Sequence, residues 1–588
     1  MRHGKQLMTL TAGLASALVL AGLAPAAGAA SAATAAAKNT PFCQELGKRI
    51  EASSGAQMYC FGAQRQQPPA HRPAQPKVRS AAPRNVDAAT VAEDVSPAGV
   101  PAQGQSETSI AATGPYVVEA WNDATGFVAQ CGAPSFKEEG TGFGFSRNGG
   151  TSFTDLGGLP NLNCGSYRFE GDPSVAAYQV GGHSYFYISS LYDSVTGVGP
   201  SDIAFDACEV TGSGAAAALA CGQPIVAATS SQCSVATPAF CSFLDKDYLA
   251  IDPARGRLYV TYSDFLISGN GGNPEAMSVC DLGTPTGGSG PAGGTPAAPV
   301  CEHGTPLKQV SPSLRQGSPY FTVAQPDPHG CENEGSYPAV DVAKGDVYVA
   351  YEYNWGSSLF LSQCQGASTR MQDVLTLAPR SCLTLTATSP CAGPTRKAAV
   401  PLVSLESTAV PGYNRFPAND FPRLAVSDKY GAVSMVWNDA RLHPYGDILL
   451  QSFGLGSLSP VQARPAVLDR PHGGGLSMMP ALRTANASGL LDVSWYSRAS
   501  VATADTAVLA VIGVSPRAAA TPPNVTITSA LSNWDNNSSL IVPNFGDYTD
   551  AAISVTGSPP YLGSTLYVAW SDGRLGIPQP FEAHLPAG

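Results

Sequence analysis

The segment GDYTDAAISVTGSPPYLGSTLYVAWSDGR, residues 546–574, decides the fold class. It reads as an acidic turn, a short strand, a Gly- and Pro-containing connection, and a second strand that ends in Trp570 and Asp572. Alternating apolar residues, as in LYVAW, are typical of a strand packed within a sheet. The same order of elements recurs in TSIAATGPYVVEAWND (108–123), GDPSVAAYQVGGHSYFYISSLYD (171–193), KDYLAIDPARGRLYVTYSD (246–264), GSYPAVDVAKGDVYVAYEYN (335–354), NDFPRLAVSDKYGAVSMVWNDAR (419–441) and SMMPALRTANASGLLDVSWYSR (477–498).

Seven copies predict an all-β fold, a single β-propeller of seven blades over residues 86–588. Each copy supplies the two inner strands of a blade, and segments such as 447–453 supply outer ones. The copies are spaced more widely than the ~40 residues of a minimal blade, which fits insertions such as 283–299. Six blades is the alternative if the first or sixth copy is not a blade. The strand ends taken as equivalent are Trp121, Leu191, Tyr262, Tyr351, Trp437, Trp495 and Trp570.

The last copy leaves room for only one more strand, around 580–585, so its blade lacks a fourth. The segment 85–91 precedes the first copy and has no other partner. We therefore expect an N-terminal strand to close the ring, which removes the open sheet edges that favour aggregation.

The N-terminus has the features of a secretory signal. Basic residues precede an apolar run over 7–23, and small residues follow it, so residues 1–30 are predicted to be a signal peptide. The Ala- and Pro-rich residues 31–85 are predicted to be a propeptide or linker. The protein is therefore expected to be secreted and extracellular, with no membrane insertion.

The 14 cysteines agree with export, because disulfides persist outside the cell. Spacing favours local pairs, although sequence alone does not fix connectivity. The hypothesis pairs Cys43 with Cys60, Cys131 with Cys164, Cys208 with Cys221, Cys233 with Cys241, Cys280 with Cys301 and Cys382 with Cys391, leaving Cys331 and Cys364.

The repeat also predicts where chemistry would take place. The loop entering the first strand of a blade and the turn leaving the second lie at the same end of the ring, and both carry acids. Many of these acids will cap turns, but a crowded set should raise some pKa values or bind a cation. The first set is Asp172, Asp247, Glu334, Asp420, Asp547 and Asp550; the second includes Asp123, Asp193, Asp264, Glu352, Asp439, Asp572, Arg441, Arg498 and Arg574.

One segment resembles a known family. Residues 146–153, SRNGGTSF, resemble the Asp-box (BNR repeat) of sialidases, with Asn148 and Phe153 in place of the usual Asp and Trp. The repeated VYVAW-type strand followed by Asp also resembles secreted sialidase-like propellers. The resemblance covers most of residues 86–588 as a repeat pattern. The Asp-box itself is a folding element.

This resemblance implies a set of functional residues. Sialidases clamp a carboxylate with three arginines, for which Arg441, Arg498 and Arg574 are the candidates because guanidinium groups bind carboxylates in a bidentate manner. They also use a tyrosine nucleophile with an acidic helper, here Tyr337 with Glu334 or Tyr548 with Asp547. The early Phe-Arg-Ile-Pro motif of the family is absent.

Two function classes stay open. The first is a glycoside hydrolase acting on extracellular glycan, with Asp172, Asp247, Glu334, Asp420, Asp547 and Tyr548 as catalytic candidates and Arg441, Arg498, Arg574, Asp439 and Asp572 as substrate-binding candidates. The second is a non-catalytic propeller that binds a glycan or glycoprotein. A structural calcium ion is a further expectation, and we expect a monomer. The net charge of −11 argues against a nucleic-acid partner.

Overall fold

The computed structural model describes residue 60 and residues 82–588 apart from several gaps. The predicted signal peptide, most of the predicted linker and Asp420 lie outside the described residues. The gaps are 92–103, 130, 132–138, 196–200, 231–241, 267–273, 302–320, 325–331, 356–369, 384, 386–394, 405–409, 414–420, 444–445, 470–474, 486–487, 518–521, 538, 540, 542 and 555–564.

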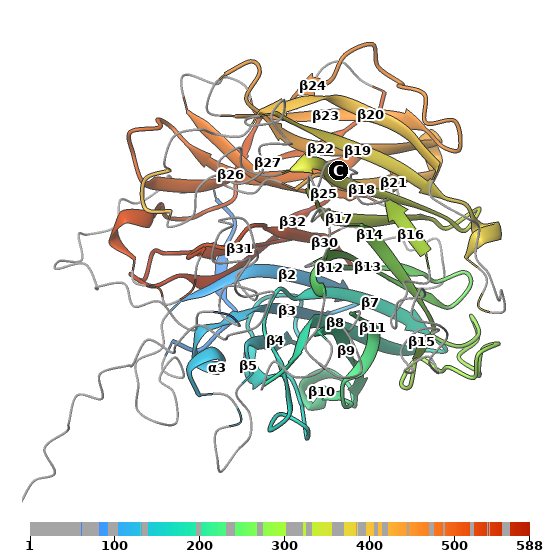
Figure 1. Ribbon diagram of the computed structural model, residues 1–588. Coiled ribbons are helices and arrows are strands. Elements are labelled where there is room, and N and C mark those ends of the chain that lie inside the picture. Colours follow the sequence, from blue (N-terminus) through green and yellow to red (C-terminus); the bar gives the residue numbers. More distant parts are fainter. Residues whose placement is uncertain are drawn as a thin grey trace, which may run out of the picture.

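The described strands form seven antiparallel sheets, which confirms the seven-bladed propeller (Figure 1). The short helix α3 (Ala124–Ala129) follows the first pair of strands. Blade 1 holds β2 (Gln105–Thr113), β3 (Tyr116–Asp123), β4 (Thr141–Ser146) and β5 (Thr154–Gly158); blade 2 holds β7 (Ser174–Val180), β8 (His183–Ser194), β9 (Ser201–Thr211), β10 (Ala218–Cys221), β11 (Ile225–Thr229) and β6 (Tyr167–Phe169); blade 3 holds β12 (Ser242–Asp252), β13 (Arg257–Leu266), β14 (Glu275–Asp281), β15 (Val300–Cys301) and β16 (Phe321–Ala324); blade 4 holds β17 (Glu332–Asp341), β18 (Asp346–Trp355), β19 (Arg370–Ala378) and β20 (Thr395–Ser404).

The last three sheets repeat this plan, and short 3₁₀ turns interrupt some of the connections. Blade 5 holds β21 (Arg423–Ser427), β22 (Ala432–Asp439), β23 (Asp447–Gly454) and β24 (Ala466–Val467); blade 6 holds β25 (Leu476–Thr484), β26 (Leu491–Arg498), β27 (Asp505–Val514), β28 (Val525–Thr526) and β29 (Ser532–Asn533); blade 7 holds β30 (Asp550–Ile553), β31 (Thr565–Asp572), β32 (Gln579–Pro586) and β1 (Asn85–Asp87).

The inner strands form a closed circuit. Along the chain β2, β7, β12, β17, β21, β25 and β30 each contact the next, and β30 returns to β2. A separate hydrophobic cluster lies between each pair of neighbouring blades among the described residues. Burial of apolar side chains between sheets therefore holds the ring together at every interface.

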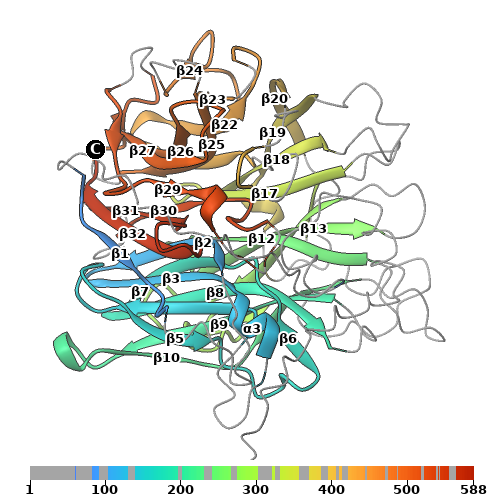
Figure 2. The same ribbon diagram turned by 90° about the vertical axis from the view of Figure 1, so that its left-hand side faces the viewer.

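The N-terminal strand closes the ring as predicted. β1 pairs antiparallel with β32, with Asn85 opposite Ala583 and Asp87 opposite Phe581. Figure 2 shows this strand, coloured blue, beside the red β32 from the other end of the chain. It is the fourth strand that the last copy of the repeat lacks.

In blade 2, the residue equivalent to Trp121 differs by one position from the one predicted from the sequence. Ser174 is paired with Ser189, just as Ser109 is paired with Ala120 in blade 1. The residue of blade 2 equivalent to Trp121 is therefore Ser190, one position before Leu191. The sequence alignment favoured Leu191 because it is apolar, whereas the hydrogen-bonded ladder fixes the register.

Three of the expected disulfides are present. They join Cys131 to Cys164, Cys208 to Cys221 and Cys280 to Cys301. Each remaining pair involves at least one residue outside the described part of the chain. The segment resembling an Asp-box forms the turn between β4 and β5, where Asn148 Oδ1 accepts hydrogen bonds from Ser146 Oγ at 2.9 Å and from the Ser152 amide at 3.0 Å.

Candidate functional site

A repeated backbone feature aims side chains at the axis. The ladder between the first two strands is irregular near the start of β2, β12, β17 and β25. The residue two positions before regular pairing resumes has positive φ: Glu107 at 54°, Lys246 at 53°, and Asp172, just before β7, at 57°. This conformation costs a non-glycine residue about 1–2 kcal/mol. Glycine and methionine hold the same place in blades 4 and 6, at Gly335 and Met479.

The side chains so placed meet around one ammonium group. Lys246 Nζ lies 2.6 Å from Asp547 Oδ2, 3.1 Å from Asp172 Oδ2 and 3.6 Å from Glu107 Oε1. These four residues, from blades 7, 1, 2 and 3, are here called the axial cluster. Every member is at most 3% exposed.

Hydrogen bonds orient the carboxylates of the axial cluster. Asn122 donates through Nδ2 to Glu107 Oε2 at 2.7 Å and accepts from the Asp172 amide at 2.5 Å. Glu107 Oε1 accepts from the Asp547 amide at 3.1 Å. One asparagine on β3 therefore links the Glu107 carboxyl group to the backbone of Asp172 in the neighbouring blade.

The cluster contains groups of different protonation tendency. Burial raises the pKa of Glu107 well above its usual range, and the neighbouring charge of Asp172 raises it further, while Lys246 opposes both effects. Burial alone would lower the pKa of Lys246. The charges of Asp172, Asp547 and Glu107 outweigh that effect and raise it, so the lysine stays protonated. A carboxyl group with a raised pKa therefore lies beside a buried ammonium group.

Aromatic rings cover the cluster. Lys246 Nζ lies 5.5 Å from the centre of the Phe421 ring and 5.7 Å from that of Tyr548, both within the range of cation–π attraction. The Tyr548 hydroxyl donates to the Pro173 carbonyl at 3.0 Å, and Tyr413 donates to Asp547 Oδ1 at 3.3 Å. The Tyr548 phenol has a pKa raised well above its usual range, mainly by burial.

The sequence-predicted acids divide into two groups. Asp172 and Asp547 join the axial cluster, with Tyr548 against it. Asp247 is also buried and accepts a hydrogen bond from Ser189, and burial raises the pKa of its carboxyl well above normal. Glu334 is fully buried and paired across the ladder with Glu352, away from the ammonium contacts.

The three predicted arginines are held separately, each in its own blade. Arg441 pairs with Asp439, and Arg574 pairs with Asp572 at 2.6 Å. Arg498 donates to Thr506 Oγ1 at 2.9 Å and lies 4.6 Å from the centre of the Trp534 ring. Each guanidinium group therefore stabilises a strand end in this structure.

Two of these arginines belong to a repeated Trp-x-Asp-x-Arg turn. The Trp570 indole donates to Asp572 Oδ2 at 2.8 Å, and Oδ1 of the same carboxylate accepts the Arg574 amide at 2.8 Å. The Trp437 indole and the Arg441 amide contact Asp439 in the same way, at 3.2 and 2.9 Å. The recurring aspartate therefore ties a core tryptophan to the turn that follows its strand.

This turn leads to a stability prediction. We expect Asp572→Ala to lower the free energy of unfolding by about 2–4 kcal/mol, because it removes the acceptor of a buried indole N–H and the carboxylate that pairs with Arg574. Asp439→Ala should cost a similar amount. Urea denaturation followed by tryptophan fluorescence would measure both, and a cost below about 0.5 kcal/mol for each would contradict the structural role.

Glu107 and Lys246 were missed as site residues. Strict alignment of the repeat would have found them, because each lies two residues before the regularly paired part of its inner strand, as Asp172 does in blade 2. Lys246 is also the single basic residue between two aspartates, Asp245 and Asp247.

Metal binding stays a prediction. In the described part of the chain, one group of three potential ligands lies close together, namely Cys131, Glu139 and Cys164. Its two cysteines form a disulfide, so they are not thiolate ligands. The expected calcium ion is not assigned to residues. No helix among the described residues is long and apolar enough to cross a membrane.

The architecture defines the class as a seven-bladed β-propeller. Comparison with solved structures finds several similar chains. Hadza microbial sialidase Hz136 has a TM-score of 0.36 at 11% identity, over 72% of this chain and 66% of that one. A Trypanosoma rangeli sialidase has 0.34 at 10%, over 74% and 58%. The GH93 α-L-arabinofuranosidase of Fusarium graminearum has 0.35 at 6%, over 86% and 97%.

The chain thus spans less than two thirds of the length of these two sialidases. At such low identities the likeness concerns the fold alone. No protein-family model matches the sequence, and no curated protein matches it.

Proposed function

We propose that this protein is a secreted, carbohydrate-directed propeller that hydrolyses glycosidic bonds at the axial cluster. The observation that supports this is the left-handed backbone of Glu107, Asp172 and Lys246, which brings three ionisable side chains to one point on the axis. Backbone strain of this kind concentrates at functional sites.

Stability alone is a poor reason for such a cluster. Replacing buried ion pairs with well-packed apolar side chains is often neutral or stabilising. The equivalent places in blades 4 and 6 hold glycine and methionine, so the fold itself accepts uncharged residues there. The charges at the other three places therefore favour a chemical role.

The cluster has the groups that glycoside hydrolysis needs. Glu107, whose pKa is raised mainly by burial, would donate a proton to the leaving oxygen as general acid. Asp172 or Asp547, held in contact with the Lys246 ammonium, would act as base or nucleophile. Lys246 would stabilise the negative charge that remains after proton transfer.

The sialidase form of this proposal needs further groups. A carboxylate clamp built from Arg441, Arg498 and Arg574 would require these side chains to exchange their present partners for substrate. Tyr548 would likewise have to release the Pro173 carbonyl before it could attack a sugar. An exo-glycosidase that does not depend on a carboxylate clamp fits the present contacts more simply.

Burial favours a second candidate, a non-catalytic propeller that binds extracellular glycan or glycoprotein. Glu107, Asp172 and Asp547 are each at most 1% exposed, and Tyr413, Phe421 and Tyr548 lie over or against them. In this case the axial cluster has a structural role, holding the blades together, and the ligand binds elsewhere on the ring. We propose a monomer for either function.

Turnover of a panel of fluorogenic glycosides, sialosides included, tests the proposal. We expect Glu107→Gln to lower kcat on the responsive substrate by at least about 100-fold, since it removes the donated proton. The free energy of unfolding should change by less than about 1 kcal/mol, because glutamine has nearly the shape of glutamic acid and its amide oxygen can still accept a hydrogen bond.

Glu119→Gln is the matched control. Glu119 is also a fully buried carboxyl whose pKa burial raises well above normal, but it lies near Glu582, whose charge raises that pKa further. Its turnover should equal that of the unchanged protein. Absence of turnover on every glycoside, together with saturable binding on a glycan array, would select the binding propeller instead.

A further inference from the structure

A second feature of the axis lies beyond the axial cluster. The inner strands surround a cavity of about 610 Å³, which is within the usual range for a small-molecule site. Its lining extends to the hairpin turns of blades 3 and 4 at Pro253, Ala254, Val342 and Ala343. These turns join the first and second strands, so they lie at the opposite end of the ring from the axial cluster.

The wall of this cavity is built from small and aliphatic side chains. In each blade we count from the first residue of the inner strand that pairs regularly with the second strand. The residue two positions later is alanine in six of the seven blades and arginine in the seventh. Larger residues there would narrow the bore. Five of the alanines line the cavity, namely Ala111, Ala176, Ala250, Ala425 and Ala552.

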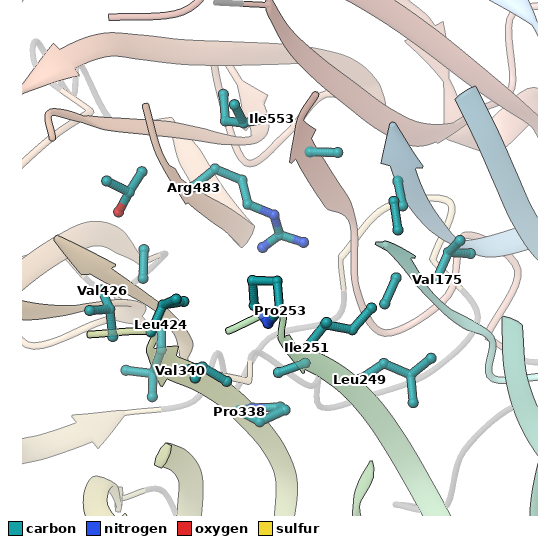
Figure 3. A pocket seen from close by; sticks show the side chains of 18 of the residues that line it. Val175, Leu249, Ile251, Pro253, Pro338, Val340, Leu424, Val426, Arg483 and Ile553 are labelled. Atoms are coloured by element: carbon teal, nitrogen blue, oxygen red, sulfur yellow. The ribbon is translucent and has the colours of Figure 1, made fainter. Parts of the chain in front are cut away.

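The arginine in this ring is Arg483, and Figure 3 shows its side chain extending into the cavity between aliphatic walls. Its Nη2 contacts Asp550 Oδ1 at 2.7 Å, and Nη1 donates to the Tyr337 hydroxyl. Figure 3 also places Leu424, Ile251 and Pro253 around it. A cation among apolar side chains is unusual, because a buried charge is costly without a partner.

The layer behind Arg483 adds a second cation. Arg423 is 2% exposed, and its guanidinium carbon lies 4.9 Å from the centre of the Tyr248 ring and 5.1 Å from that of Tyr337. Among the described residues, Arg423 Nε and the Tyr248 hydroxyl have no hydrogen-bond partner. Asp550 pairs with Arg483, whereas no carboxylate of the described residues pairs with Arg423, which leaves one excess positive charge in this layer.

We infer that the cavity binds an amphipathic monoanion, namely an aliphatic carboxylate whose head group pairs with Arg483 and whose chain occupies the alanine-lined bore. The excess charge matches a single carboxylate, and guanidinium groups bind carboxylates in a bidentate manner. Most of the lining is aliphatic, which favours an alkyl chain over a sugar or a peptide backbone. Asp428, which also lines the cavity, would repel an anion there, so the head group binds at Arg483.

This site is independent of the proposed hydrolysis, so each can fail without the other. The test uses calorimetry of the whole protein with decanoate and with decan-1-ol, which has the same chain without the charge. We expect one decanoate per protein with a dissociation constant near ~10 µM, and at least tenfold weaker binding of decan-1-ol.

Two variants separate head-group recognition from chain burial. Arg483→Gln combined with Asp550→Asn leaves the net charge of the layer unchanged and should weaken decanoate binding at least tenfold, with decan-1-ol binding unchanged. Ala250→Phe should fill the bore and abolish binding of both. Arg147→Gln, at an exposed arginine of the Asp-box-like turn, is the matched control and should bind as the unchanged protein does.

Several outcomes would overturn the inference. They are a dissociation constant for decanoate above about 1 mM, equal affinity for decanoate and decan-1-ol, and unchanged binding in the folded Ala250→Phe variant. Melting curves of each variant establish that it is folded. Several decanoate molecules bound per chain without saturation would indicate detergent-like adsorption and would also count against the site.

Discussion

Replacing Lys246 with methionine should lower the free energy of unfolding by about 3–5 kcal/mol at pH 7.5. Methionine keeps much of the volume but removes the ammonium group that contacts Glu107, Asp172 and Asp547. Removing one partner of a buried ion cluster leaves like charges unpaired in a medium that solvates them poorly. Urea denaturation would measure the loss.

The deficit of this variant should depend on pH. Burial already raises the folded-state pKa of Glu107, and without the opposing charge of Lys246 this pKa rises further. A carboxyl group whose pKa is raised in the folded state destabilises that state at pH values above its unfolded pKa of about 4. This destabilisation disappears as pH falls, because the group is then protonated in both the folded and the unfolded state. We therefore expect a larger deficit at pH 7.5 than at pH 5.

Lys344→Met provides the matched control for Lys246→Met. The Lys344 ammonium lies 3.7 Å from Asp341, but its side chain is 55% exposed. A solvent-exposed pair contributes at most about 1 kcal/mol. A Lys246→Met protein as stable as the Lys344→Met protein at pH 7.5 would show that the axial cluster is solvated and would remove the basis for a protonated Glu107.

Deleting the closing strand should have a similarly large effect. A chain that starts at residue 89 should be less stable by about 4 kcal/mol or more than one that starts at residue 82. It lacks β1, which covers the edge of β32. An uncovered edge also favours association between chains, so the shorter protein should aggregate on heating.

One side chain of this strand provides a finer test. Asn85 donates to the Ile527 carbonyl at 2.9 Å, and its Oδ1 accepts from the Ser529 amide at 2.6 Å and from Arg574 at 2.9 Å. These bonds join blade 7 to the connection that leaves blade 6. Asn85→Ala should therefore cost about 2–3 kcal/mol at the net value of roughly 1 kcal/mol per bond.

The two shortened proteins that test closure differ only in residues 82–88, and both lack the residues before 82. Differential scanning calorimetry would compare them. Equal melting temperatures for the two, with no effect of Asn85→Ala, would mean that the ring holds together without its N-terminal strand.

Much of the fold was predictable because its signals are local. Period-two hydrophobicity marked the first two strands of each blade, and the shortage of residues after Asp572 revealed the missing strand. The Ser190 register was not predictable in this way, since a ladder depends on which amides and carbonyls pair rather than on apolar character. Three disulfides followed from short separations along the chain.

The site was predictable only in part. Asp172 and Asp547 were identified from their places in the repeat, whereas Glu107 and Lys246 were not, although each occupies the equivalent offset. The arginine clamp inferred from family resemblance joins residues that the structure holds in separate turns. The exposure of the acids was beyond sequence reasoning, because it depends on distant residues such as Tyr413 and Phe421.

The sequence by itself determined the all-β class, the seven repeats and the closure of the ring. Strand periodicity and turn chemistry act over a few residues, so a single chain displays them directly. The tertiary structure alone decided that Glu107, Asp172 and Asp547 surround Lys246, and that alanines and Arg483 line one bore. Those contacts join residues hundreds of positions apart, and they exist only once all seven blades have closed on a common axis.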